Sequence, residues 1–166
     1  MATALKKKSV NDLKKISGAK KMRVAVLVSE WNAEITEALY KGTFQTLVAS
    51  GVKEKNIIKK YVPGSFELTL GAQFFAQQSK IDGVICLGCV IQGETKHFDF
   101  ICNAVANGIT NVSLKYNKPV IFGVLTTNNL QQARDRSGGK YGNKGEEAAI
   151  TGLKMLELKK QLYRRT

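Results

Sequence analysis

His97 is the only histidine in the chain, and it stands just after Gly93, Glu94 and Thr95, where a helix is expected to begin. Its imidazole has an unperturbed pKa of about 6.5, so it can accept and release protons near neutral pH. Backbone N–H groups ahead of a helix can receive an anion, and a glycine there lets the anion approach closely. These residue types allow proton transfer beside a bound anion, while a capping role for His97 and an ordinary turn at Gly93 are the alternatives.

Three further residue types could complete such a site. An anion needs a cation, and Arg134 or Arg136 could supply a guanidinium fork that holds phosphate through two hydrogen bonds. Trp31 could stack on a planar heterocycle or fill the core at the edge of a sheet, and the pattern favours neither. Glu67 could accept N–H groups of a ligand or stabilise the start of a helix.

The three cysteines are Cys86, Cys89 and Cys102. The first two have a CxxC spacing, but they lie in the apolar run GVICLGCVI, where residues three apart on a strand point to opposite faces of the sheet. With no second CxxC and no carboxylate cluster at ligand spacing, we expect buried, reduced thiols and no metal site. Reduced thiols also favour a cytoplasmic protein.

Alternating strand and helix patterns must position these residues. Short β-branched runs predict strands, and apolar residues at helical spacing predict the helices between them. This alternation is typical of parallel strands with right-handed crossovers, so we expect a three-layer α/β/α sandwich with a flavodoxin-like, mainly parallel four-stranded sheet. Strands are expected at 23–29, 57–62, 83–91 and 119–126, and helices at 33–50, 66–78, 98–115, 129–136 and 146–162, with a glycine-rich linker before the last helix.

Ligands of open parallel sheets bind beyond the carboxyl ends of the strands. The loops at that edge are 29–32, 63–67, 92–97 and 126–129, and they contain the only tryptophan and the only histidine. We therefore expect the site at this edge.

The composition limits the class of protein. The 166 residues fit one domain, and 43% hydrophobic residues can form a sizeable core. No apolar run reaches the roughly 20 residues that span a bilayer, and the N-terminus lacks the apolar stretch of a secretory signal. We expect a basic N-terminal arm at 1–20, one domain at 21–166 and no membrane partner.

The formal net charge of +13 invites a nucleic-acid hypothesis. The basic residues are densest at the two ends of the chain, and no RNA-binding or helix-turn-helix signature lies between them. We therefore interpret the ends as solvated and do not expect nucleic acid as the main function. A looser contact with an anionic partner stays open.

Four motifs resemble those of the 6,7-dimethyl-8-ribityllumazine synthase family, in order and spacing. They are VPGSFE at 62–67, GCVIQGETKHFD at 88–99, PVIFGVLTT at 119–127 and GNKG at 142–145. The resemblance extends from about residue 23 to residue 162. It implies the penultimate step of riboflavin biosynthesis, in which 5-amino-6-(D-ribitylamino)uracil condenses with 3,4-dihydroxy-2-butanone 4-phosphate.

The resemblance also implies roles for individual residues. His97 matches the proton-transferring residue, and no metal or organic cofactor is expected. The residues that match the uracil and ribityl pocket are Trp31, Ser65, Phe66, Glu67, Cys89, Val90, Ile91 and Phe122, and those that match the phosphate site are Glu94, Thr95, Arg136 and Lys144. Two positions depart from the usual pattern: the stacking residue is often Phe and is Trp31 here, and Cys89 often stands as a small or hydroxylated residue.

Family members form pentamers, some of which assemble into hollow icosahedral shells of sixty subunits. Their active sites lie between adjacent subunits, with the arginine and the last-helix lysine coming from the neighbour. The linker at 139–143 resembles that of shell-forming members, so we expect a homo-oligomer, a pentamer or the shell, with riboflavin synthase as a further partner.

Two other functions compete with this interpretation. A non-catalytic flavin- or nucleotide-binding protein of flavodoxin-like fold would also place an aromatic residue and a phosphate loop at the strand ends. It leaves His97 and Arg136 without a purpose. A basic RNA-binding protein would use the lysine-rich arm, and its RNA affinity would depend steeply on salt.

Overall fold

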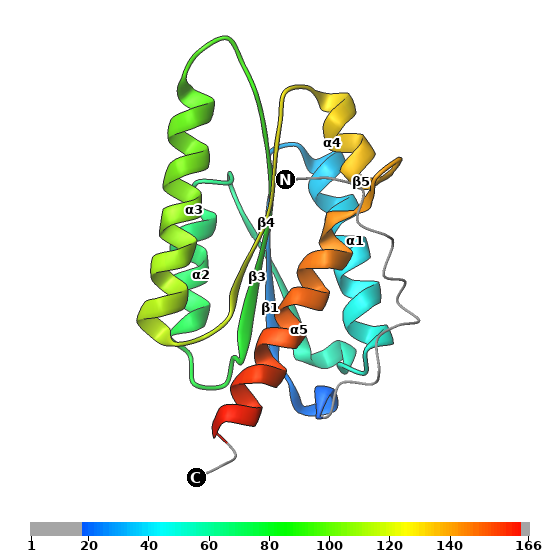
Figure 1. Cartoon of the computed structure of the whole chain (residues 1–166), viewed down its shortest axis with the longest axis vertical. Coiled ribbons are helices and arrows are strands. Elements are labelled where there is room, and N and C mark those ends of the chain that lie inside the picture. Colours follow the sequence, from blue (N-terminus) through cyan, green and yellow to red (C-terminus); the bar gives the residue numbers. More distant parts are fainter. Residues whose placement is uncertain (1–17, 164–166) are drawn as a thin grey trace.

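A four-stranded parallel sheet forms the centre of the computed structural model, which describes residues 18–163. The strand order is β2-β1-β3-β4, and the strands are β1 (Val24–Ser29), β2 (Ile57–Val62), β3 (Gly83–Ile91) and β4 (Val120–Thr127). Helices α2 (Leu68–Ala76) and α3 (His97–Tyr116) cover one face. Helices α1 (Ala33–Ala49), α4 (Leu130–Arg136) and α5 (Lys144–Tyr163) cover the other, which confirms the three-layer sandwich (Figure 1).

Each face of the sheet has its own hydrophobic core because side chains alternate along β3. Val84 and Cys86 belong to the core beneath α2 and α3, whereas Ile85, Leu87 and Cys89 belong to the core beneath α1 and α5. A central strand covered on both faces needs this continuous apolar run. The expected opposite orientation of the two CxxC thiols is confirmed.

The described chain begins within the expected N-terminal arm. Residues 1–17 of the expected arm lie outside the described residues. Ala19, in the short 3-10 helix η2 (Ala19–Lys21), is buried in the core beneath α1 and α5. The packed part of the chain therefore begins before residue 21.

The expected linker before the last helix is in part a small antiparallel pair, β5 (Ser137–Gly139) and β6 (Gly142–Asn143). Gly138 and Gly142 have positive φ angles, which glycine adopts without strain and which let the chain reverse. The run lacks β-branched residues, so its sequence indicated a loop. Asn143 attaches the pair to α1, because its Nδ2 donates to the carbonyl oxygen of Ala38 at 2.8 Å.

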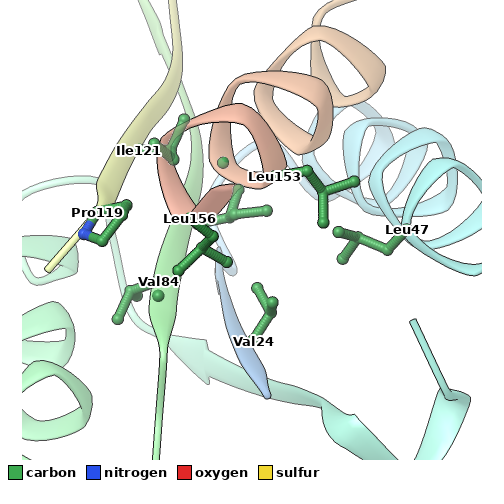
Figure 2. A pocket seen from close by; sticks show the side chains of 10 residues that line it. Val24, Leu47, Val84, Pro119, Ile121, Leu153 and Leu156 are labelled. Atoms are coloured by element: carbon green, nitrogen blue, oxygen red, sulfur yellow. The ribbon is translucent and has the colours of Figure 1, made fainter. Parts of the chain in front are cut away.

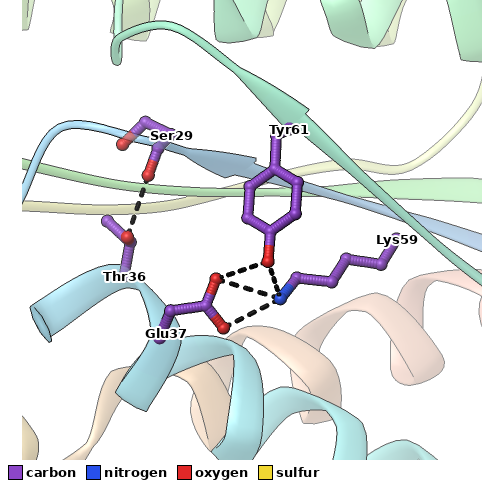
Figure 3. A network of polar contacts seen from close by, with 5 residues as sticks. All are labelled: Ser29, Thr36, Glu37, Lys59 and Tyr61. Atoms are coloured by element: carbon purple, nitrogen blue, oxygen red, sulfur yellow. Dashed lines mark hydrogen bonds and ion pairs between the residues drawn. The ribbon is translucent and has the colours of Figure 1, made fainter. Parts of the chain in front are cut away.

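Side-chain contacts attach α1 to the strands at its side (Figure 3). The Thr36 hydroxyl donates to the carbonyl oxygen of Ser29 at 2.8 Å, which fixes the start of α1 against the end of β1. Lys59 of β2 forms an ion pair with Glu37 at 2.8 Å, and the Tyr61 hydroxyl donates to the same carboxylate. These contacts hold α1, β1 and β2 in fixed relative positions, so the loops that follow β1 and β2 also begin at fixed positions.

A cavity of about 10 Å³ lies between α5 and the amino ends of the strands (Figure 2). Its walls include Val24, Leu47, Leu153 and Leu156. The lining is apolar and the volume is close to that of one water molecule, so it is a small packing defect. It lies at the opposite edge of the sheet from the expected site.

Among residues 18–163, no helix is long and apolar enough to cross a membrane. The same part of the chain has no group of three or more His, Cys, Asp and Glu side chains that could hold a metal ion.

Candidate active site

The loops at the carboxyl ends of the strands are joined by hydrogen bonds across the sheet. The Trp31 N–H donates to the carbonyl oxygen of Pro63 at 3.3 Å, and the Gln92 N–H donates to that of Thr127 at 2.8 Å. The Asn32 side chain donates to the carbonyl oxygen of Cys89 at 2.9 Å. These bonds join the β1 loop to β2 and β3, and the β3 loop to β4.

Trp31 is 74% exposed, so the alternative of a core aromatic is wrong. The backbone of the next residue explains this exposure. Asn32 has φ 59 and ψ 45, the left-handed conformation that asparagine tolerates better than most residues. The resulting turn leaves the indole in solvent at the edge of the sheet. A flat aromatic face exposed there can stack on a planar ring.

Trp31 and Glu67 both border Gly64. A Cβ at Gly64 would lie 2.9 Å from Glu67 Oε2 and 3.8 Å from Trp31 Cδ1, so the indole and the carboxylate share one small volume. Glu67 precedes α2 directly, which begins at Leu68 rather than at Phe66 as expected. The three residues before Leu68 form a turn instead, and Phe66 is 54% exposed.

Ser65 faces the sheet from the same turn. It is buried, and its hydroxyl has no hydrogen-bond partner among the described residues. A Cβ at Gly88 of β3 would lie 2.6 Å from Ser65 Oγ, so only glycine leaves room for this hydroxyl. Leaving a buried hydroxyl unpaired costs about 1–3 kcal/mol, which a water molecule or a ligand could recover.

The pocket residues on β3 and β4 are divided between the two faces of the sheet. Val90 packs on the core beneath α2 and α3, and Phe122, on the same face of β4 as Val120 and Val124, is 41% exposed. Cys89 and Ile91 pack on the opposite core. Any contact from Cys89 to a ligand near Ser65 would therefore use its backbone.

Burial raises the pKa of the Cys89 thiol to about 11 and that of the Cys86 thiol to about 12. Both thiols are uncharged at neutral pH, and thiols in this state are poor nucleophiles and poor metal ligands.

The loop from Gly93 to His97 is exposed throughout. Thr95 Oγ1 accepts the His97 N–H at 3.3 Å, and His97 is the first residue of α3. A Cβ at Gly93 would meet nothing within 4 Å in the chain, so contacts within the chain do not explain the glycine. The geometry fits an anion held by this loop at the start of a 20-residue helix.

The two arginines of α4 have different surroundings. Arg134 forms a two-pronged ion pair with Glu34 at 2.7 and 3.0 Å, and this hydrogen-bonded contact lowers the pKa of Glu34. Arg136 lies over the Tyr141 ring at 4.9 Å and donates to the carbonyl oxygen of Gln132 at 3.0 Å. Of the two, only Arg136 has no carboxylate partner among residues 18–163. Residue type alone could not separate them, whereas the family resemblance already pointed to Arg136.

Lys144 begins α5 and pairs with Glu147 at 2.7 Å. Together with Arg136 it lies on the α1 and α5 side of the sheet, whereas His97 begins a helix on the other side (Figure 1). Among the described residues, no hydrogen bond or ion pair connects His97 with Arg136 or Lys144. One chain therefore does not bring the expected proton carrier and the expected cations together.

Sequence reasoning missed Asn32 and Tyr141. Asparagine after a strand and before a helix looks like an ordinary N-cap, but here its side chain bonds to β3 and its backbone is left-handed. Tyr141 lies in the glycine-rich run, and only the positions of β5 and β6 bring it to Arg136.

Comparison with known proteins gives one consistent family. The family model described as 6,7-dimethyl-8-ribityllumazine synthase matches residues 21–160. A protein of that name from Cytophaga hutchinsonii is 66% identical over 131 residues, which cover 79% of this chain and 82% of the relative. One from Parabacteroides distasonis is 51% identical over 94% of this chain and 98% of the relative. One from Flavobacterium johnsoniae is 52% identical over 97% of this chain and 85% of the relative.

Proposed function

The chain belongs to the 6,7-dimethyl-8-ribityllumazine synthase family, and on that premise we propose that its sheet edge is one half of an active site that a second subunit completes. The observation that carries this proposal is the separation of His97 and Arg136. Both lie at the carboxyl edge, but they lie on opposite faces of the sheet. A neighbouring copy could bring its own Arg136 to this His97.

The protein is a transferase of riboflavin biosynthesis, and it acts in the penultimate step. The amine of 5-amino-6-(D-ribitylamino)uracil attacks the ketone of 3,4-dihydroxy-2-butanone 4-phosphate, and loss of water gives an imine. Phosphate then leaves, the enol tautomerises, and ring closure with loss of a second water gives 6,7-dimethyl-8-ribityllumazine. The steps need repeated proton transfers and a fixed position for the phosphate.

The uracil half of the site is assigned to the loops after β1 and β2. The exposed Trp31 stacks on the pyrimidine, and Glu67 beside it accepts ring N–H groups. The unpaired hydroxyl of Ser65 supports a polar contact to the ribityl chain. The apolar side of the pocket is formed by Phe66, Val90 and Phe122, and Cys89 and Ile91 contribute through their backbone.

The phosphate half is assigned to Glu94 and Thr95 of one chain and to Arg136 and Lys144 of its neighbour. The start of α3 supplies backbone N–H groups and a favourable dipole, and Arg136 supplies a fork that no carboxylate occupies in the described chain. His97 stands next to this loop and carries the protons. Such a positioned acid–base group accelerates a reaction by about 10²–10⁴-fold.

Exposed apolar side chains support an assembly of several subunits. On the outer surface of α2 and α3, Phe74 is 53%, Phe100 72% and Leu114 76% exposed. Large apolar side chains gathered on one exposed layer are typical of a surface that contacts another protein. We assign this layer to contacts within a pentamer and propose that pentamers assemble further into an icosahedral shell. A cytoplasmic location and an association with riboflavin synthase complete the proposal.

The test of the function is a turnover assay with the full chain and the two substrates, followed by lumazine absorbance and fluorescence. We expect turnover, and we expect His97→Ala to lower kcat roughly ten-fold or more with little change in KM, because proton transfer occurs only in the reacting complex. Binding of a flavin without turnover would favour the non-catalytic alternative. Unchanged kinetics in the variant would remove His97 from the mechanism.

A further inference from the structure

The edge of the sheet opposite the active site is strongly basic. The segments at this edge, residues 18–23, 50–56, 77–82, 117–119 and 157–163, contain nine basic residues against three acidic ones. The loops at the active-site edge, residues 30–32, 63–67, 92–96 and 128–129, contain one basic residue against three acidic ones. The excess positive charge of the described chain is therefore concentrated on one side of the molecule, which we call the basic edge.

Contacts join the segments of the basic edge into one surface. Asn56, beside Lys53 and Lys55, donates to the carbonyl oxygen of Lys20 at 3.2 Å. A Cβ at Gly18 would collide with the side chain of Lys160, so η2 lies against the end of α5. At the same end, Lys159 donates to the carbonyl oxygen of Asn117.

Asp82 is an acidic residue of this edge and lies near Lys118, while one of its carboxylate oxygens accepts the Arg23 N–H at 2.7 Å. Burial and the neighbouring charge of Lys159 lower the pKa of Lys118. The basic edge is thus a continuous surface on which like charges lie close together.

Helix dipoles explain only part of this charge. The carboxyl ends of α1, α2, α3 and α5 all point to the basic edge, and each carries about half a negative elementary charge, or about two in total. The excess of basic over acidic residues is three times that. Lys20, Lys21, Lys53 and Lys55 are exposed and make no ion pair within residues 18–163. Their charge remains available to a partner.

The described part of the chain both begins and ends at the basic edge. The described chain begins at Gly18 and ends at Tyr163, both beside the end of α5. The sequence beyond these two points adds seven basic residues and one acidic one. They are Lys6, Lys7, Lys8, Lys14, Lys15, Arg164 and Arg165, with Asp12.

We propose that the basic edge binds single-stranded nucleic acid without sequence preference. The lysines would hold phosphates, and Tyr163, which is 61% exposed beside Lys159, offers a ring for base stacking. An exposed aromatic residue among lysines suits bases better than it suits an acidic peptide, which has no planar rings to stack. The binding site lies at the opposite edge of the sheet from the substrates, so binding should leave turnover unchanged.

The test uses the full-length protein and a fluorescein-labelled single-stranded oligouridylate, with anisotropy measured over a range of salt concentrations. The test variant is Lys21→Gln, Lys53→Gln and Lys55→Gln together. The control variant removes the same charge from exposed lysines in the middle of other elements, through Lys41→Gln, Lys60→Gln and Lys154→Gln. Lumazine synthesis by both variants reports that each is folded and assembled.

The expected result is binding by the wild type that weakens steeply with salt, and a loss of at least about ten-fold in the test variant alone. The slope of log K against log salt should become shallower by about 0.7 for each lysine that contacts a phosphate. Equal weakening of both variants would overturn the proposal, and so would wild-type affinity in the test variant. Equally tight binding of polyglutamate of matched charge would contradict the choice of nucleic acid.

Discussion

At the scale of single residues, the partner of a charged group decides whether it is available to a substrate. Arg134 and Arg136 stand two positions apart on one short helix, and either could hold a phosphate by residue type. Glu34 occupies both prongs of the Arg134 fork, while Arg136 lies over an aromatic ring and has a carbonyl partner. This difference gives a matched pair of variants.

Arg136→Ala should raise the KM for the butanone phosphate roughly ten-fold or more and leave the KM for the uracil substrate nearly unchanged, because a charge-assisted fork to phosphate is lost. Arg134→Ala should change neither constant by more than about two-fold, because it removes an exposed ion pair of small net value. Steady-state kinetics with each substrate varied in turn measures both. Equal weakening of the two substrates by Arg136→Ala would contradict the assignment.

The residue types of the site could be predicted from the sequence, but the orientations of their side chains could not. Whether Trp31 is buried depends on the left-handed backbone of Asn32, which one amino-acid type does not determine. The space for the unpaired hydroxyl of Ser65 depends on Gly88 of β3, more than twenty positions further along the chain. Such features come from tertiary contacts, which a local pattern does not contain.

At the scale of elements, the alternation along β3 has a measurable consequence at high pH. Burial raises the folded-state pKa of Cys86 to about 12 and that of Cys89 to about 11, from 9.0. A group with a raised folded pKa contributes stability below its unfolded pKa and loses it as the pH rises. Between pH 9 and pH 11 the unfolded chain releases these protons and the folded chain keeps them.

The free energy of unfolding should therefore fall between pH 9 and pH 11 by about 1.4 kcal/mol per pH unit for each of the two thiols. Cys86→Ala should remove about half of that slope, whatever its effect on stability at neutral pH. Chemical denaturation at a series of pH values gives the slopes. An identical slope in wild type and variant would show that Cys86 does not stay protonated in the folded state.

Two glycines of α5 differ in what surrounds them. A Cβ at Gly152 would lie 3.4 Å from Ile121 and 3.7 Å from Ile85, at the wall of the small cavity in Figure 2. A Cβ at Gly145 would lie 2.0 Å from the carbonyl oxygen of Leu39, inside the contact between α5 and α1. One site has room for a methyl group and the other has none.

Gly152→Ala should stabilise the fold by about 1 kcal/mol, because alanine favours a helix interior over glycine and the methyl group fits an existing space. Gly145→Ala should destabilise it by at least about 2 kcal/mol, because α5 must move away from α1. Thermal unfolding of the two variants beside the wild type gives the order. A lower melting temperature for Gly152→Ala would mean that the cavity wall cannot accept a methyl group.

The strands and helices themselves were largely predictable. Apolar runs and helical spacing predicted all four strands of the sheet and all five α-helices of residues 18–163, with ends that differ by two residues or fewer. The exceptions are short: β5 and β6 lie in a glycine-rich run, η2 holds one buried alanine in a polar stretch, and the 3-10 helix η3 (Glu54–Asn56) is a single turn before β2. Each of these elements has only two or three residues, which is too few for a periodic pattern.

At the scale of the whole molecule, the sheet has two different edges. The carboxyl edge holds the exposed indole, the unpaired serine hydroxyl and the start of α3, while the amino edge holds most of the net positive charge of the described chain. The three layers also separate His97 from Arg136, because α3 and α4 cover opposite faces. The proposed active site therefore needs a second chain, whereas the fold of the described residues does not.

Complementation between two impaired variants, at a butanone phosphate concentration well below the KM of Arg136→Ala, tests this claim most directly. His97→Ala and Arg136→Ala subunits are co-expressed in equal amounts, so that they mix within one assembly, and turnover is compared with that of each variant alone. If each site takes His97 from one chain and Arg136 from the next, about one quarter of the sites regain both groups, and turnover should approach one quarter of the wild-type value. Turnover no greater than that of the separate variants would contradict a shared site and return both residues to a single chain.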